Sequence, residues 1–117
     1  VPAAKIISGI PFYSRLWCTT TNADGTTTVT SEAMGMNDAQ QALENNQAES
    51  TWDETTQQNY AQFEGEDGAL YQIWLEDTKS LTKKLELIKN YNLAGVAEWK
   101  LGLEDDSVWD LIAKYIS

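Results

Sequence analysis

The side chains that could do chemistry in this sequence are carboxylates, aromatic rings and one arginine, because histidine is absent. Without histidine, Ser-His-Asp and Cys-His catalysis, His-ligated zinc and imidazole-based pH sensing are excluded. Cys18 is the single cysteine, so an internal disulfide and a thiolate metal cluster are excluded too. If this chain were itself an enzyme, Glu98 would be the carboxylate best placed for a general acid, but no partner residue for such catalysis lies at a recognisable spacing from it in the sequence. We expect no metal and no cofactor.

The chain has an excess of acidic over basic residues, and the imbalance is concentrated in one segment. Its 117 residues include 18 acidic and 8 basic side chains, for a net charge of −10. No basic residue lies between Arg15 and Lys79. Such a stretch repels phosphate groups, so we expect no nucleic-acid partner and no membrane partner. An ordinary solvated surface would account for the same imbalance.

The length and the 42% apolar content fit one domain with a core of its own. No apolar run approaches the roughly 20 residues of a membrane span. The chain begins with Val1-Pro2 rather than Met, which we interpret as a processed product or a piece of a longer protein.

Two apolar stretches at opposite ends of the sequence predict strands that pair in parallel. Residues 5–12 are rich in isoleucine, and Pro11 is expected to end this strand because it cannot donate to a ladder. Residues 95–99 predict a second, shorter strand. A helix is predicted before it at about 78–91, and a strand–helix–strand crossover implies parallel pairing.

Each predicted helix has a candidate capping residue. Asp77 is expected to cap the helix at about 78–91, and Asn92 suits the left-handed position after it. The inward stripe of this helix is predicted as Leu81, Leu85, Leu87 and Ile88. Asn37 is expected to cap a short helix at about 38–47, and Asp106 a last helix.

The middle of the chain predicts antiparallel hairpins. Residues 19–33 are rich in threonine around Asp24-Gly25, a strong turn signal, and predict a loose hairpin. Residues 64–68 predict a second hairpin loop. Extended pieces are predicted at 50–53, 59–63 and 69–75, the last as a central strand. We expect Tyr71, Ile73, Trp74 and Leu85 to share one core.

Three groups of residues resemble glycoside hydrolase family 18, the chitinase family. Lys5-Ile-Ile-Ser-Gly-Ile-Pro-Phe-Tyr-Ser-Arg-Leu-Trp17 resembles its seventh barrel strand, and Leu93-Ala-Gly-Val-Ala-Glu-Trp-Lys-Leu-Gly-Leu-Glu-Asp105 resembles its eighth. Trp52-Asp-Glu54, Tyr60 and Trp74-Leu-Glu-Asp77 look like parts of the chitinase insertion domain between those strands. The bacterial spore-cortex and cell-wall branch of the family is the most similar.

The resemblance implies an α+β fold with two components. A small antiparallel-sheet insertion domain with helices would occupy 18–92, including the helix at about 78–91. Two parallel strands and helices, from 1–17 and 93–117, would be left from an incomplete (β/α)8 barrel, since a whole barrel needs about 250 residues. The missing N-terminal part of the barrel is then an expected partner, and open strand edges predict self-association.

The family's catalytic pattern, Asp-x-x-Asp-x-Asp-x-Glu, is absent, because no Asp here is followed two residues later by Glu. The resemblance implies a parent glycosidase that is retaining and substrate-assisted. It would act on β-1,4-linked N-acetylglucosamine polymers, with the present chain inactive alone. Chitin or peptidoglycan, and exo- or endo-action, stay open. An extracellular, cell-wall or spore location is implied.

The resemblance implies that this chain forms part of the wall of a sugar-binding cleft. Trp99 would form an apolar floor under the sugar, while Tyr13 and Arg15 would hydrogen-bond its hydroxyls. Glu76 and Asp53 could accept hydrogen bonds from sugar hydroxyls. The alternatives are core packing for Trp99 and Tyr13, a salt bridge for Arg15, and a cap or solvated carboxylate for Glu76 and Asp53.

Two other functions remain open from the sequence. The parent could be a carbohydrate-binding, lectin-like protein that has lost catalysis. The chain could also be an unrelated α+β interaction domain. Sequence upstream of Val1 distinguishes the three, because each predicts a different state of the catalytic pattern.

Overall fold

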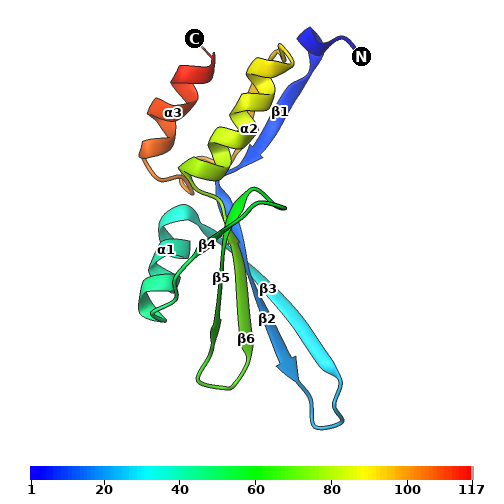
Figure 1. The fold of residues 1–117 in the computed structure, drawn as a ribbon, viewed down its shortest axis with the longest axis vertical. Coiled ribbons are helices and arrows are strands. Elements are labelled where there is room, and N and C mark those ends of the chain that lie inside the picture. The colour runs from blue at the N-terminus through cyan, green and yellow to red at the C-terminus, as the bar shows by residue number, and fades with distance from the viewer. Residues whose placement is uncertain (117) are drawn as a thin grey trace.

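The computed structural model describes residues 1–116 as two sheets joined end to end, with both termini at the end that carries the smaller sheet (Figure 1). After a short 3-10 helix (Ala3–Lys5), the strands are β1 (Ile7–Pro11), β2 (Tyr13–Thr21), β3 (Thr27–Gly35), β4 (Thr51–Asp53), β5 (Gln58–Glu64), β6 (Leu70–Leu75) and β7 (Gly95–Trp99). The α-helices are α1 (Met36–Asn45), α2 (Thr78–Asn90) and α3 (Ser107–Ile116). This mixed α+β architecture is the one predicted from the sequence.

The small sheet is the predicted parallel pair of β1 and β7. Its register runs from Ile7 opposite Gly95 to Pro11 opposite Trp99, and Pro11 ends β1 as expected. Helices α2 and α3 pack against this pair. The buried cluster that they share consists of Ile10, Phe12, Met36, Leu81, Leu85, Ile88, Val108 and Ile112.

The large sheet is antiparallel, with strand order β3-β2-β6-β5-β4, so β6 is central as predicted. Helix α1 lies against one face of it (Figure 1). The second buried cluster, formed there, consists of Ala39, Leu43, Ala61, Ile73 and Leu75. The Thr-rich segment forms two paired strands of nine residues rather than a loose hairpin, because β2 and β3 stay in register from Tyr13–Gly35 to Thr21–Thr27.

The cap predicted for α2 is confirmed. The Asp77 carboxylate accepts from the Ser80 N–H at 2.9 Å, and the Ser80 hydroxyl accepts from the Asp77 N–H at 3.0 Å. Asn92 adopts the left-handed conformation, with φ of 52°. Leu87 was predicted to face inward, which is wrong: it is exposed, because two residues of helix turn it away from buried Leu85.

One other predicted cap and one predicted core are wrong, and at the start of α3 a side-chain bond comes from the residue before the predicted cap Asp106. Helix α1 begins at Met36 with Gly35 as its N-cap, because β3 runs directly into the helix, and Asn37 lies inside it. At α3 the Ser107 N–H bonds the Asp105 carboxylate at 3.0 Å, while Asp106 contributes its backbone carbonyl. Leu85 belongs to the cluster of the parallel pair and not to that of Ile73, because the apolar side of α2 faces β1.

Candidate functional site

A hollow of about 370 Å³ lies at the carboxyl ends of the two parallel strands. Its lining residues are Gly9, Ile10, Pro11, Tyr13, Ala97, Glu98 and Trp99. Because β1 and β7 are parallel, their carboxyl ends meet at one edge, where the polar and aromatic residues that follow them gather. A Cβ built on Gly9 would meet nothing within 4 Å, so the floor of the hollow is open above the backbone.

Trp99 lies at the rim of this hollow, with its backbone carbonyl hydrogen-bonded and its indole exposed to solvent. Its side chain is 68% exposed, although it lies in a strand. The Trp99 carbonyl accepts a hydrogen bond from the Phe12 N–H at 2.8 Å, and the following peptide bond to Lys100 is cis. An exposed, flat indole of this kind offers an apolar surface for the C–H face of a pyranose ring.

Glu98 and Trp99 point to opposite faces of the parallel pair, because successive residues of a strand alternate. Glu98 is in register with Ile10, whose side chain is buried in the core on the helix-covered face. Trp99 is in register with Pro11 and shares the other, uncovered face with Ala97. The carboxylate and the indole are therefore not presented to one ligand from the same side of the sheet.

Tyr13 and Arg15 extend the candidate site from the hollow onto the large sheet. Both belong to β2 and, two residues apart, point to the same face of it. Tyr13 lines the hollow, and the Arg15 guanidinium donates to the Ser31 hydroxyl at 2.7 Å. Among residues 1–116, Arg15 forms no ion pair, and the residue is exposed.

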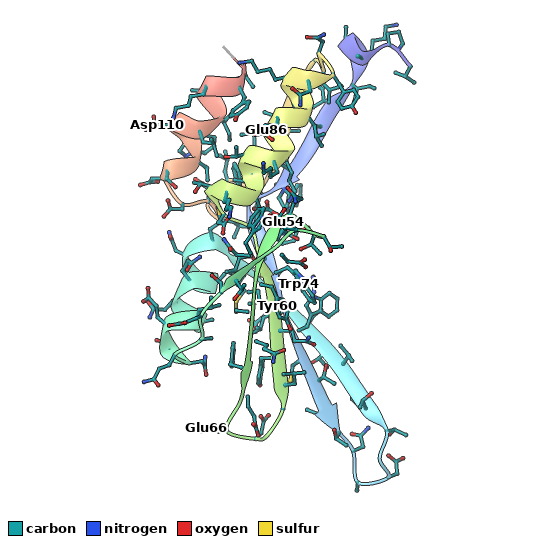
Figure 2. The ribbon with its side chains drawn as sticks, viewed as in Figure 1. Glu54, Tyr60, Glu66, Trp74, Glu86 and Asp110 are labelled. Carbon is teal, nitrogen blue, oxygen red and sulfur yellow. The ribbon has the colours of Figure 1, made fainter. Side chains whose placement is uncertain are left out.

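The face of the large sheet turned away from α1, here called the open face, carries a row of aromatic and amide side chains. Arg15 lies opposite Trp74, and Trp74 lies opposite Tyr60, with ring centroids 4.8 Å apart. Figure 2 shows Tyr60 and Trp74 together on this side of the sheet. The Gln72 amide donates to the Tyr60 hydroxyl at 2.8 Å, which donates to Gln62 at 2.9 Å.

These open-face residues were not singled out by the sequence analysis as a group. Gln72 and Trp74 alternate with Tyr71, Ile73 and Leu75 along β6, and this period of two carried the signal. Trp17, two residues beyond Arg15, is also on the open face and 38% exposed. Trp52 points to the other face, where the Lys79 ammonium lies 3.9 Å from the centre of its ring.

Asp53 lies at the edge of the open face, on the short strand β4. Its carboxylate accepts from the Thr56 hydroxyl at 2.9 Å and from the Thr55 N–H at 3.0 Å. The hydrogen bond from Thr56, then that from Thr55, lowers the pKa of Asp53, and the Trp74 indole adds a smaller contribution. Asp53 is thus an ionised acceptor beside Trp74.

Glu76 is placed differently from the other candidate residues, since only 3% of it is exposed. Its carboxylate accepts from the Ser80 hydroxyl at 2.7 Å and pairs with the Lys84 ammonium. Burial raises the pKa of Glu76, and the hydrogen bond and charge of Lys84 oppose that shift. With protein partners on both oxygens, the carboxylate is directed into the protein rather than toward the open face.

The described residues hold no group of three or more Cys, Asp or Glu side chains arranged for a metal ion. None of the helices within 1–116 has the length and apolarity to cross a membrane. The structure thus places Tyr13, Arg15, Asp53 and Trp99 on adjoining, half-exposed or exposed faces and sets buried Glu76 apart at the junction of the sheets.

Known proteins share this architecture over the whole chain. The cortical fragment-lytic enzyme of Bacillus subtilis is 31% identical over 113 residues, which are 97% of this chain and 26% of that protein. The spore cortex-lytic enzyme SleL of Bacillus megaterium has a TM-score of 0.86 with 27% identity, covering 100% of this chain and 27% of its own. A chitinase from Chromobacterium violaceum has a TM-score of 0.85 with 27% identity, covering 100% and 34%.

The chain therefore spans about a quarter to a third of the length of these relatives. Residues 1–104 match the glycosyl hydrolases family 18. This match includes both parallel strands, the large sheet and α2, which are the elements that build the exposed surface. The chain belongs to glycosyl hydrolase family 18.

Proposed function

We propose that this chain forms one side of the substrate cleft of a family 18 glycosidase that acts on β-1,4-linked N-acetylglucosamine polymers. The observation that carries the proposal is the exposure of Trp99 over a hollow at the carboxyl ends of β1 and β7. Within residues 1–116 the indole stays bare on the face of the parallel pair that α2 and α3 leave uncovered, and a sugar platform needs such a bare ring. Tyr13 and Arg15, on the adjoining strand, supply donors for sugar hydroxyls.

The surface has the composition expected of a binding wall rather than of a catalytic centre. In substrate-assisted glycosidases the N-acetyl carbonyl of the sugar attacks the anomeric carbon while an acid protonates the leaving oxygen. The Asp-x-x-Asp-x-Asp-x-Glu pattern is absent from this sequence, and Glu98 faces away from Trp99. The chain would bind and orient the sugar, and other parts of the protein would supply the acid.

The polymer and the place of action are proposed from the relatives. Two of the three relatives described above are named for lysis of spore cortex, and the third is a chitinase. We therefore propose peptidoglycan or chitin as the substrate, and a spore, cell-wall or extracellular location. A carbohydrate-binding, lectin-like function is the second candidate, favoured by the exposed aromatic and amide row on a chain that lacks the catalytic pattern.

The test compares the full-length protein with this chain alone. Full-length protein should release sugars from N-acetylglucosamine hexamers or from purified spore cortex, while the isolated chain should release none. Turnover by the isolated chain at an enzyme-like rate, on the order of 1 s⁻¹, would show that the acid lies within these residues. Tight binding by the full-length protein without hydrolysis would favour the lectin-like function.

A further inference from the structure

The chain crosses twice between the two sheets, and the two crossings are hydrogen-bonded to each other. Strand β1 continues into β2 through Phe12, and β6 continues into α2 through Glu76 and Asp77. The Glu76 N–H donates to the Ser14 hydroxyl at 2.8 Å. Ser14 and Glu76 are both buried at this junction, so the bond is shielded from water.

The Glu76 carboxylate accepts hydrogen bonds from residues on both sides of this junction. Its Oε1 accepts from the Ser80 hydroxyl at 2.7 Å, and its Oε2 pairs with the Lys84 ammonium and accepts from the Gln58 amide at 3.3 Å. Ser80 and Lys84 belong to α2, while Gln58 begins β5 of the large sheet. A buried charge persists only where such partners compensate its lost hydration.

Met36, the first residue of α1, also links the two sheets, because it belongs to the cluster of the parallel pair and its N–H donates to the Leu103 carbonyl at 2.8 Å. The polar junction adds bonds of preferred direction to this contact. The buried residues form two separate clusters, one beneath α2 on the parallel pair and one beneath α1 on the large sheet. Apolar contact is non-directional, whereas a charge-assisted hydrogen bond has a preferred geometry. Because α2 is packed on β1 through Leu81 and Leu85, the Lys84 ammonium moves with the parallel pair.

We propose that the buried Glu76–Lys84 pair is a positioning device that holds the open face of the large sheet at a fixed angle to Trp99. The inference rests on the proposed function, because the angle matters only to a ligand that contacts both surfaces. A long sugar chain would lie on Trp99 and continue past Tyr13 over Trp74 and Tyr60. A short sugar would occupy the hollow alone and be insensitive to the angle.

The test uses full-length protein with changes at Lys84. Lys84→Met breaks the pair, Lys84→Arg keeps the charge, and a Lys84→Met variant that also carries Glu76→Gln removes both charges in case the single variant fails to fold. Lys83→Met is the matched control, because Lys83 makes only an exposed pair with Glu86 at 3.7 Å one residue earlier on α2. The substrates are an N-acetylglucosamine hexamer and a chromogenic disaccharide.

In both pair-breaking variants we expect kcat/KM for the hexamer to fall roughly tenfold, mainly through KM, with less than about a twofold change for the disaccharide. Lys84→Arg should restore the hexamer value, and Lys83→Met should leave it unchanged. Equal losses on both substrates, or no loss on either, would overturn the inference, since a general loss of folded protein lowers both.

Hydrogen exchange distinguishes failure of this inference from failure of the proposed function. If the parent protein neither hydrolyses nor binds either sugar, the proposed function fails. In that case the inference is tested by amide hydrogen exchange at the junction of Glu76 and Ser14. Faster exchange there in Lys84→Met than in Lys83→Met, with unchanged protection in the cluster around Ile73, supports a positioning pair. Equal exchange in the two variants overturns it.

Discussion

The Phe12 N–H and the Trp99 carbonyl are joined by a 2.8 Å hydrogen bond just beyond the last residue of β1. This bond extends the parallel ladder by one step and ties the start of β2 to the end of β7. Tyr13, the next residue along, is thereby held beside Trp99 at the rim of the same hollow. Tyr13 and Trp99, which are 86 positions apart in the sequence, thus become neighbours through backbone pairing.

Replacing Trp99 with alanine in the full-length protein should reduce catalysis far more than stability. Within residues 1–116 the indole is 68% exposed, so its removal leaves no cavity among these residues. Loss of about 3–4 kcal/mol of transition-state stabilisation would lower turnover roughly 10²–10³-fold. Turnover per folded molecule and the melting temperature should be measured together.

Trp109→Ala is the matched control for Trp99. The Trp109 ring packs edge-on against buried Phe12, with centroids 5.6 Å apart, on the helix-covered side. This variant should lower the melting temperature and leave the activity of the folded fraction unchanged. If Trp99→Ala behaves as Trp109→Ala does, the sugar platform is excluded and Trp99 is a structural residue.

The isolated chain should self-associate in solution. Both edges of the β1–β7 pair are free among the described residues, and Ile7, Trp99 and Leu101 are exposed at 62%, 68% and 74%. Unpaired edges and bare apolar side chains favour pairing with another copy. Light scattering over a concentration series should show mass rising above 13.1 kDa. A constant monomer at the highest concentration contradicts this expectation.

Asp77→Ala should destabilise the protein by about 0.5–2 kcal/mol, because the carboxylate satisfies the Ser80 N–H in the first turn of α2. Asp106→Ala is the control. Among the described residues, Asp106 contributes its backbone carbonyl to the start of α3, so the loss of unfolding free energy in this variant should stay within about 0.5 kcal/mol. Chemical denaturation of both variants measures the difference, and equal losses would argue against the cap.

Asp53 should titrate below its ordinary pKa of 3.8, since the Thr56 hydroxyl and the Thr55 N–H stabilise the carboxylate. A lowered pKa contributes stability that is present above 3.8 and is lost as the pH falls through the folded-state value. Thr56→Val removes the largest cause, so the variant should be less stable than the parent near neutral pH and converge with it in acid. Carboxyl NMR gives the pKa directly, and an unshifted Asp53 would refute the assignment.

The sequence by itself determined the local elements of this protein. The cap at Asp77, the left-handed Asn92, the strand end at Pro11 and the extended run at residues 70–75 all depend on neighbours within a few positions. Side-chain hydrogen bonds, preferred φ values and apolar runs are properties of the chain segment itself. The motifs that resemble family 18 also lie within continuous segments.

The tertiary structure alone decided which side chains share a surface. Whether Trp74 faces α1 or solvent depends on strand register and on which face the helix covers, and neither is encoded within β6. Glu76 and Asp53 are both carboxylates near strand ends, yet one is buried with Lys84 and the other lies half-buried at a sheet edge with Thr55 and Thr56. Burial is set by the segments that pack over a residue, and these come from distant parts of the chain.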